Sequence, residues 1–330
     1  MLIEKETMKK ILIITNKDDV TVDFIIKLLQ KDGIEYYRFN TEDLFTVVDV
    51  RFRIDVDQYI LCDKAKKIEV DLSEISAVYF RRPGLPNFQY IADISGTERK
   101  YLMRETLSVL DGVYKNLKDC FWINDVFRIR EAENKLFQLS MARDAGFDIP
   151  ETILSNDADF VKQSMKQIDA DEGFVIKAVR SGNVDPETAK TIIFTADIDP
   201  EEVTEESIGE FPAYIQRKIS KRSDLRSIVV GDKVFTAEII SQNDEDAKTD
   251  WRRSTRVLEH RPFLLSQDIS NKCIELTRKL GLVYSAIDFA LDDSGKPVFL
   301  ECNPNGQWAW IENRLGFPIS NEIEGLLLHG

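Results

Sequence analysis

Two carboxylates and one amide near the end of the chain have the residue types and spacing of a hard metal-ion site. Asp288 stands in an apolar run, and Glu301 and Asn303 close a second β-rich run after a Gly-containing turn. This pattern predicts a β-hairpin. Side chains alternate along a strand, so Glu301 and Asn303 share one face, with Asp288 across from them. Leu300 and Cys302 then occupy the opposite face. Carboxylate and amide oxygens suit Mg²⁺ held together with phosphates, which indicates nucleotide-dependent chemistry.

The alternative is that Asp288 and Glu301 are ordinary polar positions on a half-exposed hairpin. Asp288, however, has apolar residues on both sides in the sequence. Burying a bare carboxylate is costly unless something pairs with it. The metal interpretation is therefore favoured.

Several cations have positions that suit anionic ligands. Lys177 lies inside the apolar run 174–179, where a buried ammonium needs an anionic partner such as a phosphate. The alternative is a half-exposed strand with Lys177 pointing outward. Arg81 and Arg82 follow a predicted strand directly, at the end where open α/β sheets bind ligands. A solvated basic turn explains this arginine pair equally well.

Composition excludes several classes of protein. The chain has 330 residues, of which 43% are hydrophobic and 31% charged, as in ordinary globular proteins. Its net charge of −14 argues against a general nucleic-acid binder. No stretch approaches the length of a membrane span, and no signal-peptide pattern is present. The four cysteines lack a CxxC spacing and fit reduced thiols, so we expect a cytoplasmic protein. With only two histidines, a Ser-His-Asp mechanism is not expected.

The order of elements predicts an α/β start followed by α+β segments. Residues 11–39 have a β-α-β pattern, which suggests a small doubly wound domain, and no GxGxxG motif supports a dinucleotide site. We expect one long helix over roughly 126–145, which carries Lys135, and a strand over 191–195. The polar stretch 242–256 is expected to be a mobile loop.

The residues that could do chemistry follow one another in the order seen in ATP-grasp ligases. A lysine on a helix precedes a lysine on a strand, a linking strand, Asp-x-Arg before a Gly-Asp hairpin, and finally Asp…Glu-x-Asn. The chain resembles that superfamily over roughly 120–310. The N-terminal segments 11–15, 37–43 and 79–83 look like those of microviridin-type peptide maturases, also called graspetide ligases. So do the segment 134–139 and the pair formed by Lys177 and Phe194-Thr195, which extends the resemblance over nearly the whole chain.

This resemblance implies an ATP-grasp fold with an N-terminal doubly wound pre-ATP-grasp domain. The implied domains are residues 1–118, a central lobe over 119–212 and a C-terminal lobe over 213–330. The loop over phosphate is glycine-rich in many relatives, whereas residues 180–190 contain only Gly182. The contacts of that loop are therefore left open.

The resemblance also implies site residues. The ATP-binding set is Lys135, Lys177, Gln216, Arg217, Lys218, Ile219 and Asn303. Asp288, Glu301 and Asn303 would hold Mg²⁺, while Arg226 and Lys177 would be catalytic. The substrate-binding set is Asp224, Arg226, Trp251, Arg252 and Asn305, to which the arginines Arg81 and Arg82 are added from their position.

The implied activity is ATP-dependent joining of Asp or Glu side chains of a ribosomal precursor peptide to Thr, Ser or Lys side chains, giving macrocyclic esters or amides. The implied partner is that peptide, recognised through a leader segment by the C-terminal half, and a homodimer is an expectation. No nucleic acid or membrane partner is expected. Two alternatives remain: a ligase that adds a free amino acid to a carboxylate, as glutathione synthetases and protein-tail glutamate ligases do, and a non-catalytic nucleotide- or peptide-binding module.

Overall fold

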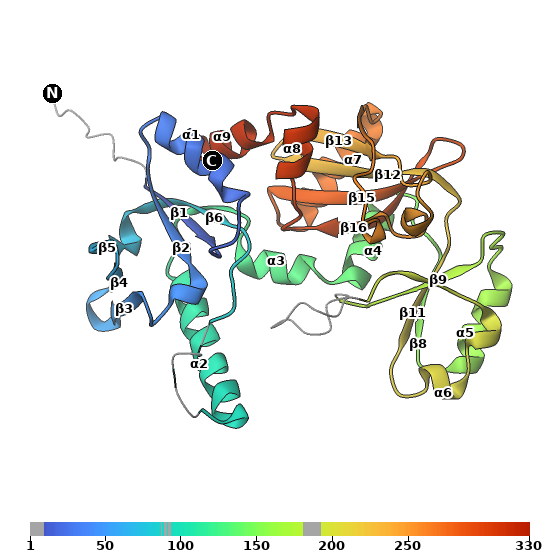
Figure 1. The fold of residues 1–330 in the computed structure, drawn as a ribbon, viewed down its shortest axis with the longest axis horizontal. Helices are drawn as coiled ribbons and strands as arrows, with labels where there is room; N and C mark the ends of the chain where they lie inside the picture. Colours follow the sequence, from blue (N-terminus) through green and yellow to red (C-terminus); the bar gives the residue numbers. More distant parts are fainter. Residues whose placement is uncertain (1–9, 87, 89–90, 92–93, 181–192) are drawn as a thin grey trace. The chain divides into compact units, whose positions relative to one another are not determined.

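The computed structural model describes residues 10–86, 88, 91, 94–180 and 193–330. The described residues fall into two compact units (Figure 1). The first contains the chain up to Ile129 together with Gln307–Ala309 and Pro318–Gly330. The second contains Arg130–Gly306 and Trp310–Phe317. The last helix of the chain thus belongs to the same unit as the first strand.

The first unit is built on a parallel sheet. Its strands, in the order β2-β1-β6-β7, are β2 Glu35–Asn40, β1 Lys10–Thr15, β6 Ile75–Phe80 and β7 Phe121–Ile123. The apolar run at the centre of β1 is fully buried, as expected of a parallel strand that is covered on both faces. The predicted doubly wound start of the chain is confirmed.

Helices and a small second sheet complete this unit. The helices are α1 Val22–Lys31, α2 Gly96–Lys115 and α9 Ile319–His329, and α3 Val126–Ala132 runs across the boundary to the second unit. Helix α9 contacts α1, β6 and β7. The antiparallel sheet consists of β3 Val48–Arg53, β4 Gln58–Asp63 and β5 Ile68–Asp71. Short 3-10 turns lie at Thr41–Asp43, Ile54–Val56 and Leu72–Glu74.

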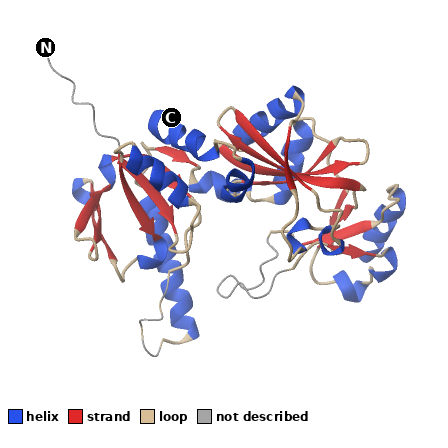
Figure 2. Ribbon diagram, turned by 45° about the horizontal axis from the view of Figure 1, so that its top comes forward, coloured by secondary structure: helices blue, strands red, loops and turns tan. Residues whose placement is uncertain are grey.

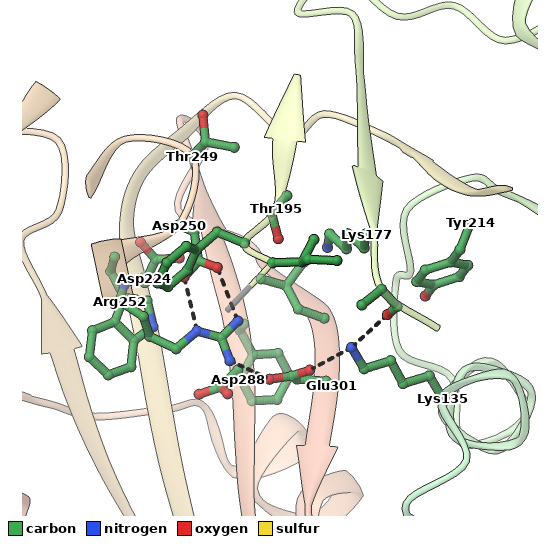
Figure 3. A pocket seen from close by; sticks show the side chains of 16 residues that line it. Lys135, Lys177, Thr195, Tyr214, Asp224, Thr249, Asp250, Arg252, Asp288 and Glu301 are labelled. Atoms are coloured by element: carbon green, nitrogen blue, oxygen red, sulfur yellow. Dashed lines mark hydrogen bonds and ion pairs between the residues drawn. The ribbon is translucent and has the colours of Figure 1, made fainter. Parts of the chain in front are cut away.

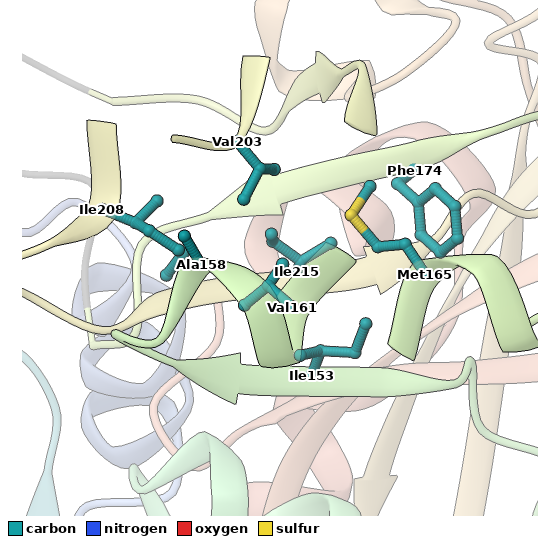
Figure 4. Packing of buried hydrophobic residues seen from close by; sticks show 9 residues of the cluster. Ile153, Ala158, Val161, Met165, Phe174, Val203, Ile208 and Ile215 are labelled. Carbon is teal, nitrogen blue, oxygen red and sulfur yellow. The ribbon is translucent and has the colours of Figure 1, made fainter. Parts of the chain in front are cut away.

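The second unit contains two antiparallel sheets among its described residues. The first has the order β10-β9-β11-β8, with β10 Ala196–Ile198, β9 Phe174–Lys177, β11 Ala213–Arg217 and β8 Thr152–Ser155. Helix α5 Ala158–Gln167 packs on β8, and a 3-10 turn at Pro200–Glu202 and helix α6 Glu205–Ile208 follow β10. Val161 and Met165 of α5 pack with Ile215 of β11 in a buried apolar cluster (Figure 4).

The second of these sheets has the order β14-β13-β12-β15-β16. Figure 2 draws its strands in red and the helices in blue. Its strands are β14 His260–Phe263, β13 Lys233–Ile239, β12 Lys221–Val230, β15 Tyr284–Asp292 and β16 Pro297–Asn303. Helix α7 Gln267–Lys279 contacts β12, β13 and β15, and helix α4 Lys135–Asp144 contacts β16. Helix α8 Ala309–Leu315 follows this sheet in the chain. The predicted combination of an α/β part with α+β lobes is confirmed.

Two predicted segments differ from the structure. The expected helix over 126–145 is two helices, α3 and α4, because Asn134 caps the second by accepting hydrogen bonds from the backbone N–H groups of Leu136 and Phe137. Of the strand expected over 191–195, residues 191–192 lie outside the described residues and 193–195 have no regular structure, whereas β10 begins at Ala196. The loop 242–256 contains 3-10 turns at Glu245–Ala247 and Trp251–Arg253, and its mobility stays a prediction. Gly182 lies outside the described residues.

No helix in the described part of the chain combines the length and the apolar character that crossing a membrane requires.

Candidate functional site

A cavity of about 420 Å³ lies in the second unit (Figure 3). Its charged lining residues are the cations Lys135, Lys177 and Arg252 and the carboxylates of Asp224, Asp250, Asp288 and Glu301. Its apolar and aromatic lining residues include Ile193, Phe194, Tyr214, Phe289 and Leu300. The volume is typical of small-molecule sites. A cavity lined by both kinds of residue suits a ligand that combines a flat apolar group with several charges.

The hairpin β15–β16 places the two carboxylates together. Asp288 is paired with Glu301 across the strands. The amide Nδ2 of Asn303 lies 3.1 Å from Asp288 Oδ2 and 3.2 Å from Glu301 Oε1. The three side chains therefore converge, and the predicted hairpin is confirmed, with Asp288 across from Glu301.

A β-bulge changes the alternation that the sequence predicts. The pairing shifts between Asp288 and Phe289, because Asp288 faces Glu301 while Phe289 faces Phe299. Leu300 is the extra residue of the bulge, and it lines the cavity together with Glu301. The expectation that Leu300 faces away is wrong, since a bulge re-aims the side chains beside it.

Two arginines bind these carboxylates. Arg226 stands opposite Asp288 on β12, and its Nη1 lies 3.0 and 2.8 Å from the two carboxylate oxygens. The Nη1 of Arg252 lies 3.2 Å from Glu301 Oε1, and Arg252 also binds Asp250 (Figure 3). Each of the two carboxylates is consequently paired with a guanidinium group.

Burial and charge act differently on the two carboxylates. Burial raises the pKa of Asp288 above its usual range, although Arg226 opposes this shift. Burial acts in the same direction on Glu301, but Arg252 and Lys135 outweigh it and lower the pKa of that carboxyl. Glu301 is therefore held in its ionised form.

Two lysines approach the cavity from separate elements. Lys135 is the first residue of α4, and its Nζ lies 3.1 Å from the carbonyl oxygen of Ala178 and 3.7 Å from Glu301 Oε2 (Figure 3). Lys177 ends β9 and donates a hydrogen bond to Gln216 Oε1 at 2.7 Å. Burial lowers the pKa of Lys177 to about 8. An anion in the cavity would favour the charged form of this lysine.

Helix α4 is fastened to the strand that carries Glu301. The buried Gln138 side chain donates to the carbonyl oxygen of Cys302 at 2.6 Å and accepts from the Cys302 backbone N–H at 3.0 Å. This pair of bonds fixes the start of α4, and with it Lys135, beside β16.

The loop after β13 is fastened through Asp224 and Asp250. Asp224 binds Lys221 at 2.7 and 2.9 Å, and Ser241 donates to it at 2.6 Å. Asp250 caps the turn Trp251–Arg253 and accepts from Arg252 Nε at 2.9 Å. Arg252 is thus presented to Glu301 by a defined backbone turn.

Two known families match successive parts of the chain. Residues 132–327 match the family described as RimK-like ATP-grasp domain, and residues 10–130 match the one described as MvdD pre-ATP grasp domain. This chain belongs to the RimK-like ATP-grasp family. The ATP-grasp match covers most of the second unit, and the pre-ATP-grasp match covers most of the first.

Solved structures similar to this ATP-grasp chain extend over nearly all of it. The macrocyclase MdnC of Microcystis aeruginosa, bound with the precursor peptide MdnA, is 27% identical with a TM-score of 0.85, over 98% of this chain and 100% of MdnC. A RiPP-associated ATP-grasp ligase of Chryseobacterium gregarium, in complex with ADP and a leader and core peptide, is 27% identical with a TM-score of 0.86, over 97% of each chain. MdnB of Microcystis aeruginosa is 26% identical with a TM-score of 0.77, over 98% of this chain and 100% of MdnB.

One curated relative matches a smaller part of this chain. The uncharacterized protein MG012 of Mycoplasma genitalium is 30% identical over 97 residues, 29% of this ATP-grasp chain. The chain spans about a third of that protein's length (32%).

The residues present fit a hard cation such as Mg²⁺. Among the described residues, no group of three or more His, Cys, Asp or Glu side chains gathers as a metal site. Mg²⁺ is typically held by one or two carboxylates, with water and phosphate oxygens completing its shell. Asp288 and Glu301 supply the carboxylates, and the Asn303 amide reaches both. Arg226 binds Asp288, and Arg252 and Lys135 bind Glu301, so the two carboxylates already favour positive charge between them.

Not every predicted site residue of the ATP-grasp chain lines the cavity. Arg217 is paired with Glu151, and Lys218 with Asp197. Arg226, Gln216, Ile219, Asn303 and Asn305 lie in the second unit but are not among the residues that line the cavity. Gln216 stands behind it, where it orients Lys177 and binds Thr152 and Tyr214.

Arg81 and Arg82 lie in the first unit, whereas the cavity lies in the second. The buried Arg81 donates to Gln307 at 3.3 Å, and the carbonyl oxygen of Arg82 accepts from Asn16. Their substrate role remains a prediction.

Sequence reasoning missed Gln138, Tyr214 and Asp250. Gln138 stands among apolar residues of the predicted helix, which was a usable signal, because a polar group on a buried helix face needs partners. Asp250 directly before Trp251-Arg252-Arg253 matches the N-cap preference, which indicated a turn in that loop. Tyr214 resembles any strand tyrosine, so no local pattern marked it.

Proposed function

We propose that this chain is an ATP-dependent ligase that activates Asp or Glu side chains of a ribosomal precursor peptide as acyl phosphates and joins them to Thr, Ser or Lys side chains. The cavity carries this proposal, because it brings Lys135, Lys177 and the Asp288–Glu301 pair together. The near-full-length similarity to MdnC, which was solved with its precursor peptide, supports the peptide as substrate. A location in the cytoplasm and a homodimer are further expectations.

In this proposal the two lysines and the linking strand bind ATP. Lys135 and Lys177 reach the cavity from opposite elements and would hold phosphate oxygens. The backbone from Gln216 to Ile219 would read adenine, while the side chains of Arg217 and Lys218 stay in their ion pairs. The apolar residues Phe289 and Leu300 would contact the flat base.

Asp288, Glu301 and Asn303 would hold Mg²⁺, which when bound neutralises charge on the phosphate oxygens. Arg252 forms an ion pair with Glu301 in the structure, and its side chain is half exposed. When Glu301 binds the ion instead, Arg252 would turn toward a substrate carboxylate. Asp224, Trp251 and Asn305 would contact the peptide, with Asp224 also holding the loop.

The chemistry needs positioning and positive charge. A carboxylate oxygen of the peptide attacks the γ-phosphorus of ATP, the bond to the bridging oxygen breaks, and ADP leaves. The hydroxyl or amine then adds to the acyl carbon, phosphate leaves, and one proton is released to solvent. Lys177 and Arg226 supply cations for the charge on the transferred group. No enzyme nucleophile is required.

The test is co-expression of the chain with each short open reading frame beside its gene, followed by mass spectrometry of the peptides. We expect one peptide to lose one or more waters, and to remain unchanged with Glu301→Gln. The control is Glu259→Gln, an exposed carboxylate in an ion pair with Arg261, which should leave the product intact. A gain in mass by an amino-acid residue, or no change with every peptide, would overturn macrocyclisation.

A further inference from the structure

An arginine-rich segment borders the cavity and is not explained by ATP binding. Residues 251–257, which we name the arginine segment, contain Arg252, Arg253 and Arg256 and no acidic residue. The chain as a whole has a net charge of −14. A basic stretch in so acidic a protein, beside a site proposed to consume carboxylates, attracts anions specifically to this place.

The arginines of this segment differ in their partners. Arg252 lines the cavity and is bound by Asp250 and Glu301. Arg253 and Arg256 are exposed, and no side-chain hydrogen bond or ion pair joins either to another residue in the described part of the chain. Arg252 is thus engaged at Glu301, while the exposed Arg253 and Arg256 of the same segment are available for an anionic ligand.

The backbone of the segment is held in place. Asp250 caps the turn Trp251–Arg253. The hydroxyl oxygen of Ser254 lies 2.8 Å from Asp244 Oδ2 and accepts a hydrogen bond from the Arg256 backbone N–H at 3.1 Å. Because the backbone is fixed on both sides of Arg253, little backbone entropy is lost when the segment binds an anion.

Aromatic side chains continue the same surface. The rings of Trp251 and Trp310 lie 5.9 Å apart, and Trp310 meets His260 at 4.9 Å. Arg314 lies over Trp310 at 5.5 Å and 2.8 Å from His260 Nδ1. Both indoles are half-buried, so they keep accessible area. Indole rings offer a rigid apolar surface to the methylene groups and backbone of a peptide.

We propose that the arginine segment, together with Trp310, is a subsite for a second acidic side chain of the peptide, next to the one that reacts. Guanidinium groups bind carboxylates in a bidentate manner, whereas a Gln side chain forms only neutral hydrogen bonds there. The subsite therefore selects peptide segments with several Asp or Glu residues. The identity of the ligand as a peptide rests on the proposed function.

The test compares two fluorescein-labelled synthetic peptides, one of alternating Glu and Thr residues and one with Gln in place of Glu. Binding is measured by fluorescence anisotropy in the presence of ADP and Mg²⁺. We expect the wild-type chain to bind the Glu peptide about tenfold more tightly than the Gln peptide. The double variant Arg253→Glu/Arg256→Glu should lose this preference, and the milder Arg253→Gln/Arg256→Gln should lose most of it.

The matched control is Lys100→Glu/Arg104→Glu on α2. It makes the same change in net charge at exposed residues without described ion pairs. This control should keep the preference for Glu. Equal binding of both peptides by the wild-type chain, or wild-type preference in the Arg253→Gln/Arg256→Gln variant, would overturn the subsite. So would a single-stranded oligonucleotide that displaces the Glu peptide at equal concentration, since the site would then bind any polyanion.

The failure of the two proposals can be distinguished. If the Glu preference depends on Arg253 and Arg256 but no peptide loses water in the co-expression test, the subsite stands and macrocyclisation fails. If peptides lose water equally in the wild-type chain and in both arginine variants, and the Glu preference is absent, macrocyclisation stands and the subsite fails.

Discussion

Two arginine–carboxylate pairs in the second unit have the same chemistry but different supports. Arg226 and Asp288 stand opposite each other on the adjacent strands β12 and β15, with side chains 8% and 10% exposed. Arg252 comes from a loop to reach Glu301 on β16, and its side chain is 49% exposed. The sheet builds the first pair into the fold, whereas the second depends on one turn of a loop.

The two pairs therefore differ in how much they contribute to the stability of the fold and in how readily the arginine can change its partner. Removing one member of a buried pair leaves an uncompensated charge, which typically costs about 3–5 kcal/mol. An exposed pair contributes about 0–1 kcal/mol. The buried pair therefore suits a fixed platform, and the exposed pair suits an arginine that changes partners when ligands bind.

The largest expected effect is that of Asp288→Asn. It should abolish ligation and lower the free energy of unfolding by about 3 kcal/mol, because Arg226 loses its anion. Glu301→Gln should abolish ligation with a loss of only about 1 kcal/mol, since Arg252 keeps Asp250 and Lys135 keeps the Ala178 carbonyl. Urea unfolding and mass spectrometry of the peptide measure the two properties. Turnover like that of the wild type in either variant would contradict the metal assignment.

Arg226→Gln should separate catalysis from nucleotide binding. Its guanidinium contacts Asp288 and does not line the cavity, so ADP affinity should change less than about threefold. Ligation should fall about 10²-fold or more, as when one stabilising contact to a transition state is removed. Calorimetric titration of ADP and single-turnover kinetics measure these quantities. Equal losses in both would indicate that Arg226 acts only in binding ATP.

Arg252→Gln tests exchange at the exposed pair. Glu301 loses a competing cation, so the Mg²⁺ concentration needed for ADP binding should fall about threefold. Stability should change by less than about 1 kcal/mol. The control is Arg261→Gln, which removes an arginine of similar exposure that is paired with Glu259 on the edge strand. A higher Mg²⁺ requirement in Arg252→Gln alone would show that Arg252 supports the ion instead of competing with it.

The same comparison shows what the sequence could predict. The hairpin of Asp288 and Glu301 is local, since its apolar alternation and Gly-containing turn determine the pairing. The contact between Arg252 and Glu301 spans 49 residues through a loop, and that of Gln138 with Cys302 spans 164. No periodicity encodes such contacts, because they depend on how separate elements pack.

The bulge at Leu300 and the cap at Asn134 differ in whether a local sequence rule predicts them. The bulge at Leu300 has no marker in the sequence, such as a glycine, and so was not predictable. Asn134, in contrast, is a preferred N-cap residue, and it stands directly before Lys135. The capping rule alone would have divided the long helix there and placed Lys135 at a helix start.

Asn134→Ala should give the smallest of these effects, and it tests whether the cap positions Lys135. Loss of the bonds to Leu136 and Phe137 should cost about 1 kcal/mol of stability. Because Lys135 is the first residue of the uncapped turn, the KM for ATP should rise a few-fold with little change in kcat. Steady-state kinetics and thermal unfolding measure both quantities.

Asp157→Ala is the matched control, since Asp157 caps α5 by accepting from the Phe160 backbone N–H and neither it nor α5 lines the cavity. It should cost similar stability and leave the KM unchanged. An equal KM increase in both variants would show that the effect comes from general loosening of the second unit. An increase confined to Asn134→Ala would place the start of α4 among the elements that determine ATP affinity, together with the Gln138 bonds that fasten this helix to β16.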